Sequence, residues 1–251
     1  MRLEVARHGP RPDPGPTLVL LHEGLGCVGM WRDWPARLAR ETGRGVLVYS
    51  RAGYGASDAV PLPRPLDYMQ REGKDALPLL VDAAGVRAAL LVGHSDGGSI
   101  ALVHAATAAD PARVRGLALL APHVFCEEVS VRSIAAAREQ YLHGDLRERL
   151  ARYHGPNVDV AFWGWNRAWL DPAFFSGFDL RAYLPSVRAP TLVIQGDADA
   201  YGTLAQVEAT AGGVSGPTAS LILPGAGHAP HRDRPDETTR AIVEFASRLL
   251  G

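Results

Sequence analysis

The stretch that decides the fold is ALLVGHSDGG, residues 89–98, in which an apolar run ends abruptly at a serine between glycines. The run is typical of a buried strand, and the alanine- and leucine-rich residues after it are typical of a helix. A Gly-x-Ser-x-Gly sequence at such a turn holds the serine in a strained conformation, and its glycines allow close approach of the chain. We therefore expect Ser95 to expose its hydroxyl at the end of a strand.

Similar apolar runs recur on both sides of this one. They lie at residues 17–22, 45–50, 116–123, 190–197 and 219–228, and a weaker candidate strand spans Leu3 to Arg7. The runs do not alternate between apolar and polar residues, and continuous apolar runs are typical of strands buried on both faces of a parallel sheet. Amphipathic stretches at 31–40, 68–84, 95–109, 204–211 and 235–250 are long enough for crossover helices. The pattern predicts an α/β fold, with a mostly parallel central sheet and helices on both faces.

One segment interrupts this alternation. Residues 123–189 contain no convincing buried strand; helical periods occur at 131–141 and 146–153. They are followed by an aromatic cluster: Phe162, Trp163, Trp165, Trp169, Phe174, Phe175 and Phe178. No repeat or low-complexity linker separates the segment from its surroundings. We expect a helical cap at 123–189, inserted into a core made of residues 1–122 and 190–251.

Composition excludes several classes of function. The chain has 251 residues, 47% of them hydrophobic, and its formal charge of −1 gives no basic field for nucleic acid or anionic membranes. Lys74 is the only lysine, which fits codon bias in a GC-rich bacterial genome. No signal peptide or membrane span is recognisable. Cys27 and Cys126 show no zinc-binding spacing, and we interpret them as buried thiols of a cytoplasmic protein.

A serine nucleophile needs a base to take its proton and a third group to orient that base. Two later strands end in suitable residues. Asp197 and Asp199 follow the strand that begins at Thr191, and His228 and His231 follow the strand that begins near Ser220. The carboxyl ends of parallel strands meet at one edge of a sheet, where open α/β folds build their sites. The sequence therefore offers serine, acid and histidine in that order.

This order, with the Gly-x-Ser-x-Gly turn, resembles the α/β-hydrolase fold superfamily, and the insertion resembles the cap of its capped serine hydrolases. The resemblance implies that Ser95 is the nucleophile, His228 the general base and acid, and Asp199 the orienting carboxylate. It favours Asp199 over Asp197 by the distance from the preceding glycine. It favours His228 over His231 by the surrounding Gly-x-Gly-His-x-Pro sequence, residues 225–230. The expected place of the cap is after the sixth strand.

The same resemblance assigns an oxyanion hole, whose backbone N–H groups stabilise negative charge on the substrate oxygen. One donor is the N–H of Asp96, directly after the serine. The other is Gly24, in a loop HEGLG at 22–26 that resembles the family's HGxPG segment, with Glu23 and Leu25 as departures. Residues 50–58, SRAGYGASD, resemble its DRxGxGxSD loop, with Ser50 in place of the aspartate. We interpret this second loop as a structural turn.

The sequence identifies the residues that contact the substrate less specifically than it identifies the triad. Glu23 and Asp96 could attract an ammonium or hydroxyl group of the substrate, or could stabilise their loop and helix start. The sequence GxSDGG resembles the serine motif of some amino-acid ester hydrolases. His123 follows a strand and is expected near the site. Trp163 represents the cap aromatics, which could line an acyl pocket or only pack the cap.

The sequence thus predicts a serine hydrolase that cleaves small carboxylic esters or related acyl compounds through an acyl-enzyme, without a metal or organic cofactor. The expected partner is a small ester or acyl substrate, with neither nucleic acid nor membrane; the oligomeric state is left open. Alternatives on the same triad are a lactonase or a carbon–carbon bond hydrolase of aromatic degradation. An alternative of another class is a non-catalytic, ligand-binding member of the fold, against which an intact triad argues. Serine at the turn argues against dehalogenase and epoxide hydrolase chemistry, which use aspartate.

Overall fold

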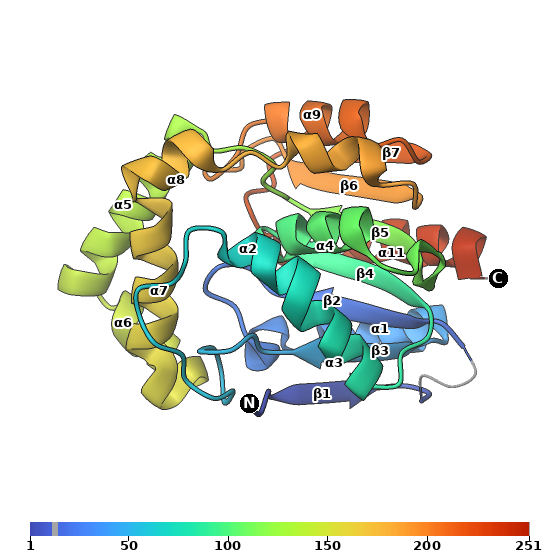
Figure 1. Ribbon diagram of the computed structural model, residues 1–251, viewed down its shortest axis with the longest axis horizontal. Helices are drawn as coiled ribbons and strands as arrows, with labels where there is room; N and C mark the ends of the chain where they lie inside the picture. The colour runs from blue at the N-terminus through green and yellow to red at the C-terminus, as the bar shows by residue number, and fades with distance from the viewer. Residues whose placement is uncertain (12–14, 251) are drawn as a thin grey trace.

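A single sheet of seven strands forms the centre of the computed structural model, which describes residues 1–11 and 15–250 (Figure 1). In chain order the strands are β1 (Val5–His8), β2 (Thr17–Leu21), β3 (Gly45–Tyr49), β4 (Ala89–His94), β5 (Val114–Leu120), β6 (Thr191–Gly196) and β7 (Thr218–Leu223). Their order across the sheet is β1-β3-β2-β4-β5-β6-β7. Only β1 among them runs antiparallel to its neighbour, so the predicted mostly parallel sheet is confirmed.

Burial along the strands follows their place in the sheet. Every residue of β2, β3, β4 and β6 is buried, as continuous apolar runs require. The strand β7 is different, because it is an edge strand and only Leu223 in it is fully buried. The prediction that this run is buried on both faces is therefore wrong.

Helices cover both faces of the sheet, as predicted. On one face lie α1 (Trp34–Thr42) and α11 (Pro235–Leu250), and on the other lie α2 (Tyr68–Arg71), α3 (Leu77–Ala83), α4 (Asp96–Thr107) and α9 (Ala205–Gly213). A π-helical turn, Glu72–Ala76, joins α2 to α3. Side chains alternate between the two faces along a strand. Leu18 and Leu20 of β2 therefore pack into the apolar core beneath α1 and α11, and Val19 and Leu21 pack into the core beneath the helices of the other face.

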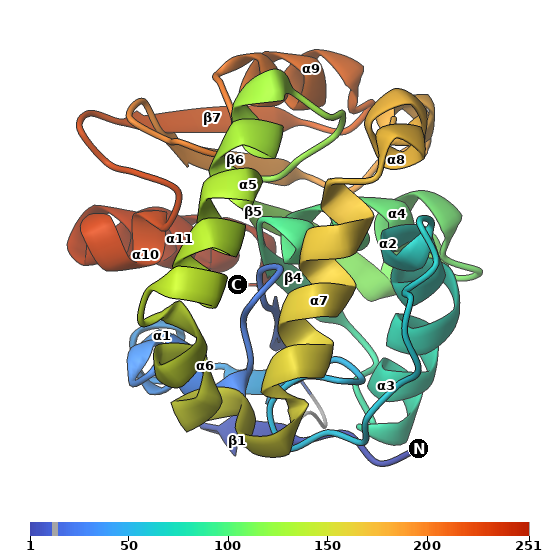
Figure 2. The same ribbon diagram turned by 90° about the vertical axis from the view of Figure 1, so that its left-hand side faces the viewer.

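The insertion forms four helices that lie together beyond the carboxyl ends of the parallel strands (Figures 1 and 2). They are α5 (Glu128–His143), α6 (Leu146–His154), α7 (Val158–Trp169) and α8 (Pro172–Gly177). The remaining helix, α10 (Pro230–Asp233), precedes α11, and short 3₁₀ turns lie at Val28–Trp31, Pro111–Arg113, Gly155–Asn157 and Arg181–Ser186. The insertion follows β5, which is the fifth strand, and not the sixth as predicted. The count is one lower because β1 is the only strand that precedes β2 in the described part of the chain.

Aromatic side chains join the cap helices to the sheet. Phe162, Trp169, Phe174 and Phe178 are buried in the same apolar core as residues of β2 and β4. Phe174 and Phe178 stack with their ring centroids 4.8 Å apart. Among the described residues, no helix has the length and apolar character needed to cross a membrane.

Candidate active site

The turn between β4 and α4 holds Ser95 in a backbone conformation that is rare for a residue with a side chain. Its φ is 53° and its ψ is −120°. A Cβ atom at Gly97 would lie 2.0 Å from the carbonyl oxygen of Leu21, and one at Gly93 would lie 2.4 Å from the carbonyl oxygen of Gly97. Both glycines are needed because backbone passes where their side chains would be. The predicted strained serine at a strand-to-helix turn is confirmed.

A continuous chain of hydrogen bonds starts at this serine. The Ser95 Oγ lies 2.9 Å from Nε2 of His228, and Nδ1 of His228 lies 2.8 and 2.9 Å from the two carboxylate oxygens of Asp199. Because a carboxylate only accepts, Nδ1 carries the proton and Nε2 accepts the serine hydroxyl proton. The structure brings together the three residues that the sequence singled out. Such an arrangement can make a serine hydroxyl nucleophilic.

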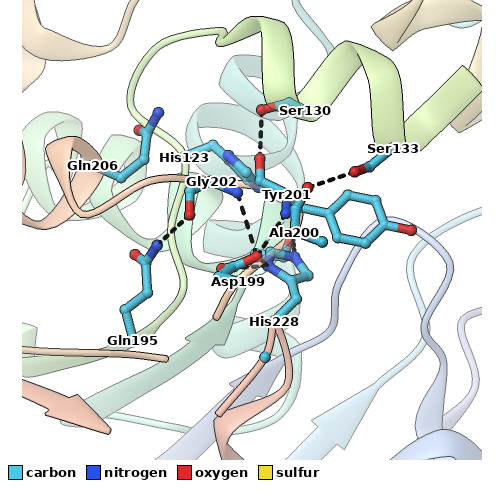
Figure 3. Close-up of polar contacts among 12 residues, drawn as sticks. His123, Ser130, Ser133, Gln195, Asp199, Ala200, Tyr201, Gly202, Gln206 and His228 are labelled. Atoms are coloured by element: carbon cyan, nitrogen blue, oxygen red, sulfur yellow. Dashed lines mark hydrogen bonds and ion pairs between the residues drawn. The ribbon is translucent and has the colours of Figure 1, made fainter. Parts of the chain in front are cut away.

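Asp199 is held as a carboxylate in an enclosed position, where its side chain is 1% exposed. Burial alone would raise the pKa of Asp199, but the hydrogen bond and charge of His228 and the N–H of Tyr201 together lower that pKa below its ordinary value. The Tyr201 N–H donates to Oδ1 at 2.7 Å (Figure 3). The rival Asp197 is exposed and accepts the Gly225 N–H at 2.6 Å, so it caps a turn and does not contact the histidine.

The loop that carries Asp199 is tied to the cap. On α5, the Ser130 hydroxyl donates to the carbonyl oxygen of Tyr201 and the Ser133 hydroxyl to that of Ala200, each at 2.5 Å (Figure 3). From the sheet side, the Gln195 amide donates to the carbonyl oxygen of Gly202 at 2.8 Å. None of these contacts was predicted from the sequence. The only signal for them is a pair of serines spaced one helical turn apart in the cap.

A cavity of about 90 Å³ lies between the cap and the end of the sheet, above Ser95. It is lined by Glu23, Gly24, Leu25, Ser95, Asp96, His123, Ile134, Trp165, Trp169, Tyr201 and His228. A larger cavity of about 260 Å³ lies between α3 and α4 and contains none of these residues. The small cavity therefore combines the hydrogen-bonded serine with an apolar wall from the cap, as ligand sites commonly do.

The two expected oxyanion donors both lie at this cavity. A Cβ atom at Gly24 would lie 2.2 Å from Nε1 of Trp165, so glycine is needed for the loop to pass beside the indole. Within the described residues, no backbone acceptor is found for the N–H of Gly24 or of Asp96. The departures at Glu23 and Leu25 leave Gly24 at the cavity wall.

Of the expected substrate-contacting residues, Glu23, Asp96 and His123 line the cavity and Trp163 does not. The guanidinium groups of Arg138 and Arg167 instead lie over the ring of Trp163, at 5.9 and 5.1 Å from it. Its place is taken by Trp165 and Trp169, which lie one helical turn apart on α7. Two residues along a helix correspond to about 200° around its axis, so Trp165 points away from Trp163. An aromatic cluster does not by itself reveal which helix face turns inward.

The two carboxylates near the serine already have partners. Tyr68 donates its hydroxyl to Asp96 at 2.5 Å, and burial raises the pKa of Asp96. Glu23 lies 3.4 Å from Nδ1 of His94 and 3.6 Å from the Arg232 guanidinium. Burial would raise the pKa of Glu23, but the hydrogen bond and charge of His94, together with other positive charges such as that of Arg232, lower the pKa well below its ordinary value. These contacts favour a structural role for both side chains.

Two further histidines near the site, His123 and His231, are buried, and the two cysteines are buried wholly or in part. Burial lowers the pKa of His123 to about 3, so its ring is neutral. His231 packs against Trp31 and Trp34, with ring centroids 4.9 and 5.1 Å away. Cys27 is buried and Cys126 is partly buried, and burial raises the pKa of each thiol to about 11. The described residues include no group of three or more side chains that could hold a metal ion.

Comparison with known proteins shows extended similarity. The model of the Alpha/beta hydrolase family matches residues 18–241. The pimeloyl-[acyl-carrier protein] methyl ester esterase of Stenotrophomonas maltophilia is 29% identical over 94% of this chain and 94% of its own length. Epoxide hydrolase A of Mycobacterium tuberculosis is 30% identical, but that match spans only 41% of this chain and 32% of the enzyme.

Solved structures with the same fold cover nearly the whole chain. The enol-lactonase from Burkholderia xenovorans superposes with a TM-score of 0.74 and 25% identity, over 98% of this chain and 96% of that one. An esterase from Exiguobacterium antarcticum superposes with a TM-score of 0.76 and 21% identity, over 98% and 95% of the two chains. The latter likeness shows the shared fold.

Proposed function

Because this chain belongs to the alpha/beta hydrolase family, we propose that it is a serine hydrolase that cleaves small carboxylic esters or related acyl compounds. The observation that carries the proposal is the hydrogen-bonded series Ser95, His228, Asp199 at the floor of a cavity. The esterase from Stenotrophomonas maltophilia and the enol-lactonase from Burkholderia xenovorans, both similar over nearly their full lengths, support an acyl substrate.

The proposed reaction has two halves. Ser95 Oγ attacks the carbonyl carbon while Nε2 of His228 takes its proton, and the resulting oxyanion accepts hydrogen bonds from the N–H groups of Gly24 and Asp96. Collapse of this intermediate breaks the bond to the leaving alcohol, which takes the proton from His228 and leaves an acyl-enzyme. Water, losing a proton to His228, then attacks the acyl carbon, and Ser95 regains its proton as the acid departs. Asp199 orients the imidazole throughout.

A cyclic ester fits the same chemistry, and the likeness to the enol-lactonase makes lactone hydrolysis the second candidate. In that case the leaving alcohol stays attached to the acyl group. Carbon–carbon bond hydrolysis also uses a serine triad, and a non-catalytic, ligand-binding role predicts no turnover at all. The two free cysteines support a reducing compartment, so the cytoplasm stays the proposed location.

The test combines labelling with turnover. We expect a fluorophosphonate probe to label the wild-type protein and the enzyme to hydrolyse short p-nitrophenyl esters, with both signals lost in Ser95→Ala. Ser176→Ala, which changes an exposed serine of α8, serves as the matched control and retains both. A wild-type protein that neither labels nor turns over esters, lactones or ring-cleavage dienoates contradicts the proposed function. The ratio of rates across these three substrate classes distinguishes the candidates.

A further inference from the structure

A buried arginine lies directly behind the loop that carries Gly24. The Arg51 side chain is 1% exposed, and its Nη1 and Nη2 donate to the carbonyl oxygens of His22 and Glu23 at 2.6 and 3.1 Å. Arg51 belongs to the loop at residues 50–58, which its sequence alone marks only as a glycine-rich turn. A planar guanidinium can bind two neighbouring carbonyl groups at once, which fixes the path of the backbone between them.

Two more donors converge on the same Glu23 carbonyl. The backbone N–H of Arg51 donates to Nε2 of His22 at 3.0 Å, so this nitrogen carries no proton in the neutral ring. The proton is therefore on Nδ1, which donates to the Glu23 carbonyl at 2.7 Å. Burial lowers the pKa of His22 well below its ordinary value and keeps the ring neutral. The N–H of Gly26 is the third donor, at 3.1 Å.

The Glu23 carbonyl and the Gly24 N–H belong to one peptide group. In a trans peptide these two groups point in opposite directions. A carbonyl held by three donors on the Arg51 side therefore directs the Gly24 N–H to the other side, where Gly24 lines the cavity. Hydrogen bonds to a carbonyl also polarise the peptide group and strengthen its N–H as a donor.

The same guanidinium reaches the second donor segment. Its Nη2 lies 3.8 Å from a carboxylate oxygen of Asp96, the residue whose N–H is the other oxyanion donor. We propose that Arg51 is a positioning residue that sets the direction of the Gly24 N–H and the spacing of the two oxyanion donors. The proposal rests on the proposed function and concerns the transition state, because the oxyanion forms only there.

The test replaces Arg51 and compares chemistry with binding. Arg51→Lys keeps the positive charge but cannot fork between two carbonyls, and Arg51→Met removes both contacts. With the best ester, we expect Arg51→Lys to lower kcat by about 10- to 100-fold, less than removal of a whole donor, while KM changes little. The affinity for a trifluoromethyl ketone falls in proportion to kcat/KM. In that adduct Ser95 Oγ bonds to the ketone carbon, its proton passes to His228, and the ketone oxygen becomes the oxyanion.

Arg64 provides a matched control. Its guanidinium and that of Arg51 both stack on Tyr54, at 4.6 and 4.9 Å from the ring centroid, but Arg64 donates to the carbonyl oxygen of Ala52 and does not contact the Gly24 loop. Arg64→Lys should retain kcat and ketone affinity. If Arg51→Lys has a melting temperature like that of Arg64→Lys and also retains kcat and ketone affinity, the role proposed for Arg51 is overturned, while the proposed function stands. If the wild-type protein lacks Ser95-dependent turnover and ketone binding, the proposed function is overturned as well.

Discussion

At the scale of single residues, the two aspartates of one loop make the clearest comparison. Asp199 accepts from His228, whereas Asp197 is exposed and caps a turn. We expect Asp199→Asn to lower kcat by about 10³- to 10⁴-fold, because an amide cannot hold the imidazole in the required tautomer. Asp197→Asn should change kcat by less than about threefold, because Asp197 does not contact His228 and the Oδ1 of asparagine can still accept the Gly225 N–H. Steady-state kinetics on both variants checks this assignment, and a reversed order of effects contradicts it.

Gly24 offers a second comparison at this scale. A methyl group there would lie 2.2 Å from the indole of Trp165, and Gly24 N–H is a proposed oxyanion donor. We expect Gly24→Ala to lower kcat by at least about 100-fold, the usual cost of a lost donor. In the background of Trp165→Leu, which removes the clashing atoms, the same change should cost much less. A double-mutant cycle on kcat measures this coupling. Equal costs in both backgrounds would show that the steric argument is wrong.

At the scale of elements, the cap acts on the triad through two hydroxyl groups. Ser130 and Ser133 of α5 hold the carbonyl groups of the loop that carries Asp199. We expect the double variant Ser130→Ala/Ser133→Ala to lose about 1–3 kcal/mol in the free energy of unfolding, the sum of two hydrogen bonds. Its kcat should fall several-fold, because Asp199 becomes less well oriented.

Urea denaturation and kinetics measure the two effects. Ser176→Ala is the control, because the Ser176 hydroxyl bonds only within α8. A double variant with normal kcat but reduced stability would show that the cap stabilises the fold without orienting the acid.

Elements and local turns could be predicted from the sequence better than the contacts between them. The turn at Ser95 and the strand ends that supply Asp199 and His228 follow from local patterns, because apolar runs and glycines act within a few residues. The role inferred for Arg51 depends on contacts with His22 and Glu23, almost thirty positions away in the chain. No local pattern encodes such a contact. For the same reason the sequence pointed to Trp163, whereas the cavity wall is made by its neighbours on α7.

At the scale of the whole molecule, burial of neutral histidines couples folding to pH. Five of the described histidines have a pKa lowered by burial: His22, His104, His123, His154 and His231. In the unfolded chain each has an ordinary pKa of about 6.5 and takes up a proton below it, which the folded protein resists. Their stabilising contribution is therefore present above about pH 6.5 and is lost as pH falls. Burial raises the pKa of Glu72 and Asp96, which act in the opposite direction.

We accordingly expect the free energy of unfolding to fall between pH 7.5 and 5.5, because each histidine contributes a slope of up to about 1.4 kcal/mol per pH unit and the histidines outnumber the opposing carboxyl groups. Urea denaturation at several pH values measures this slope. His104→Gln, which removes one buried histidine outside the proposed active site, should make the slope shallower. His143→Gln, at an exposed position on α5, should leave it unchanged. A stability that is constant or rises on acidification over this range would mean that the carboxyl groups outweigh the buried imidazoles.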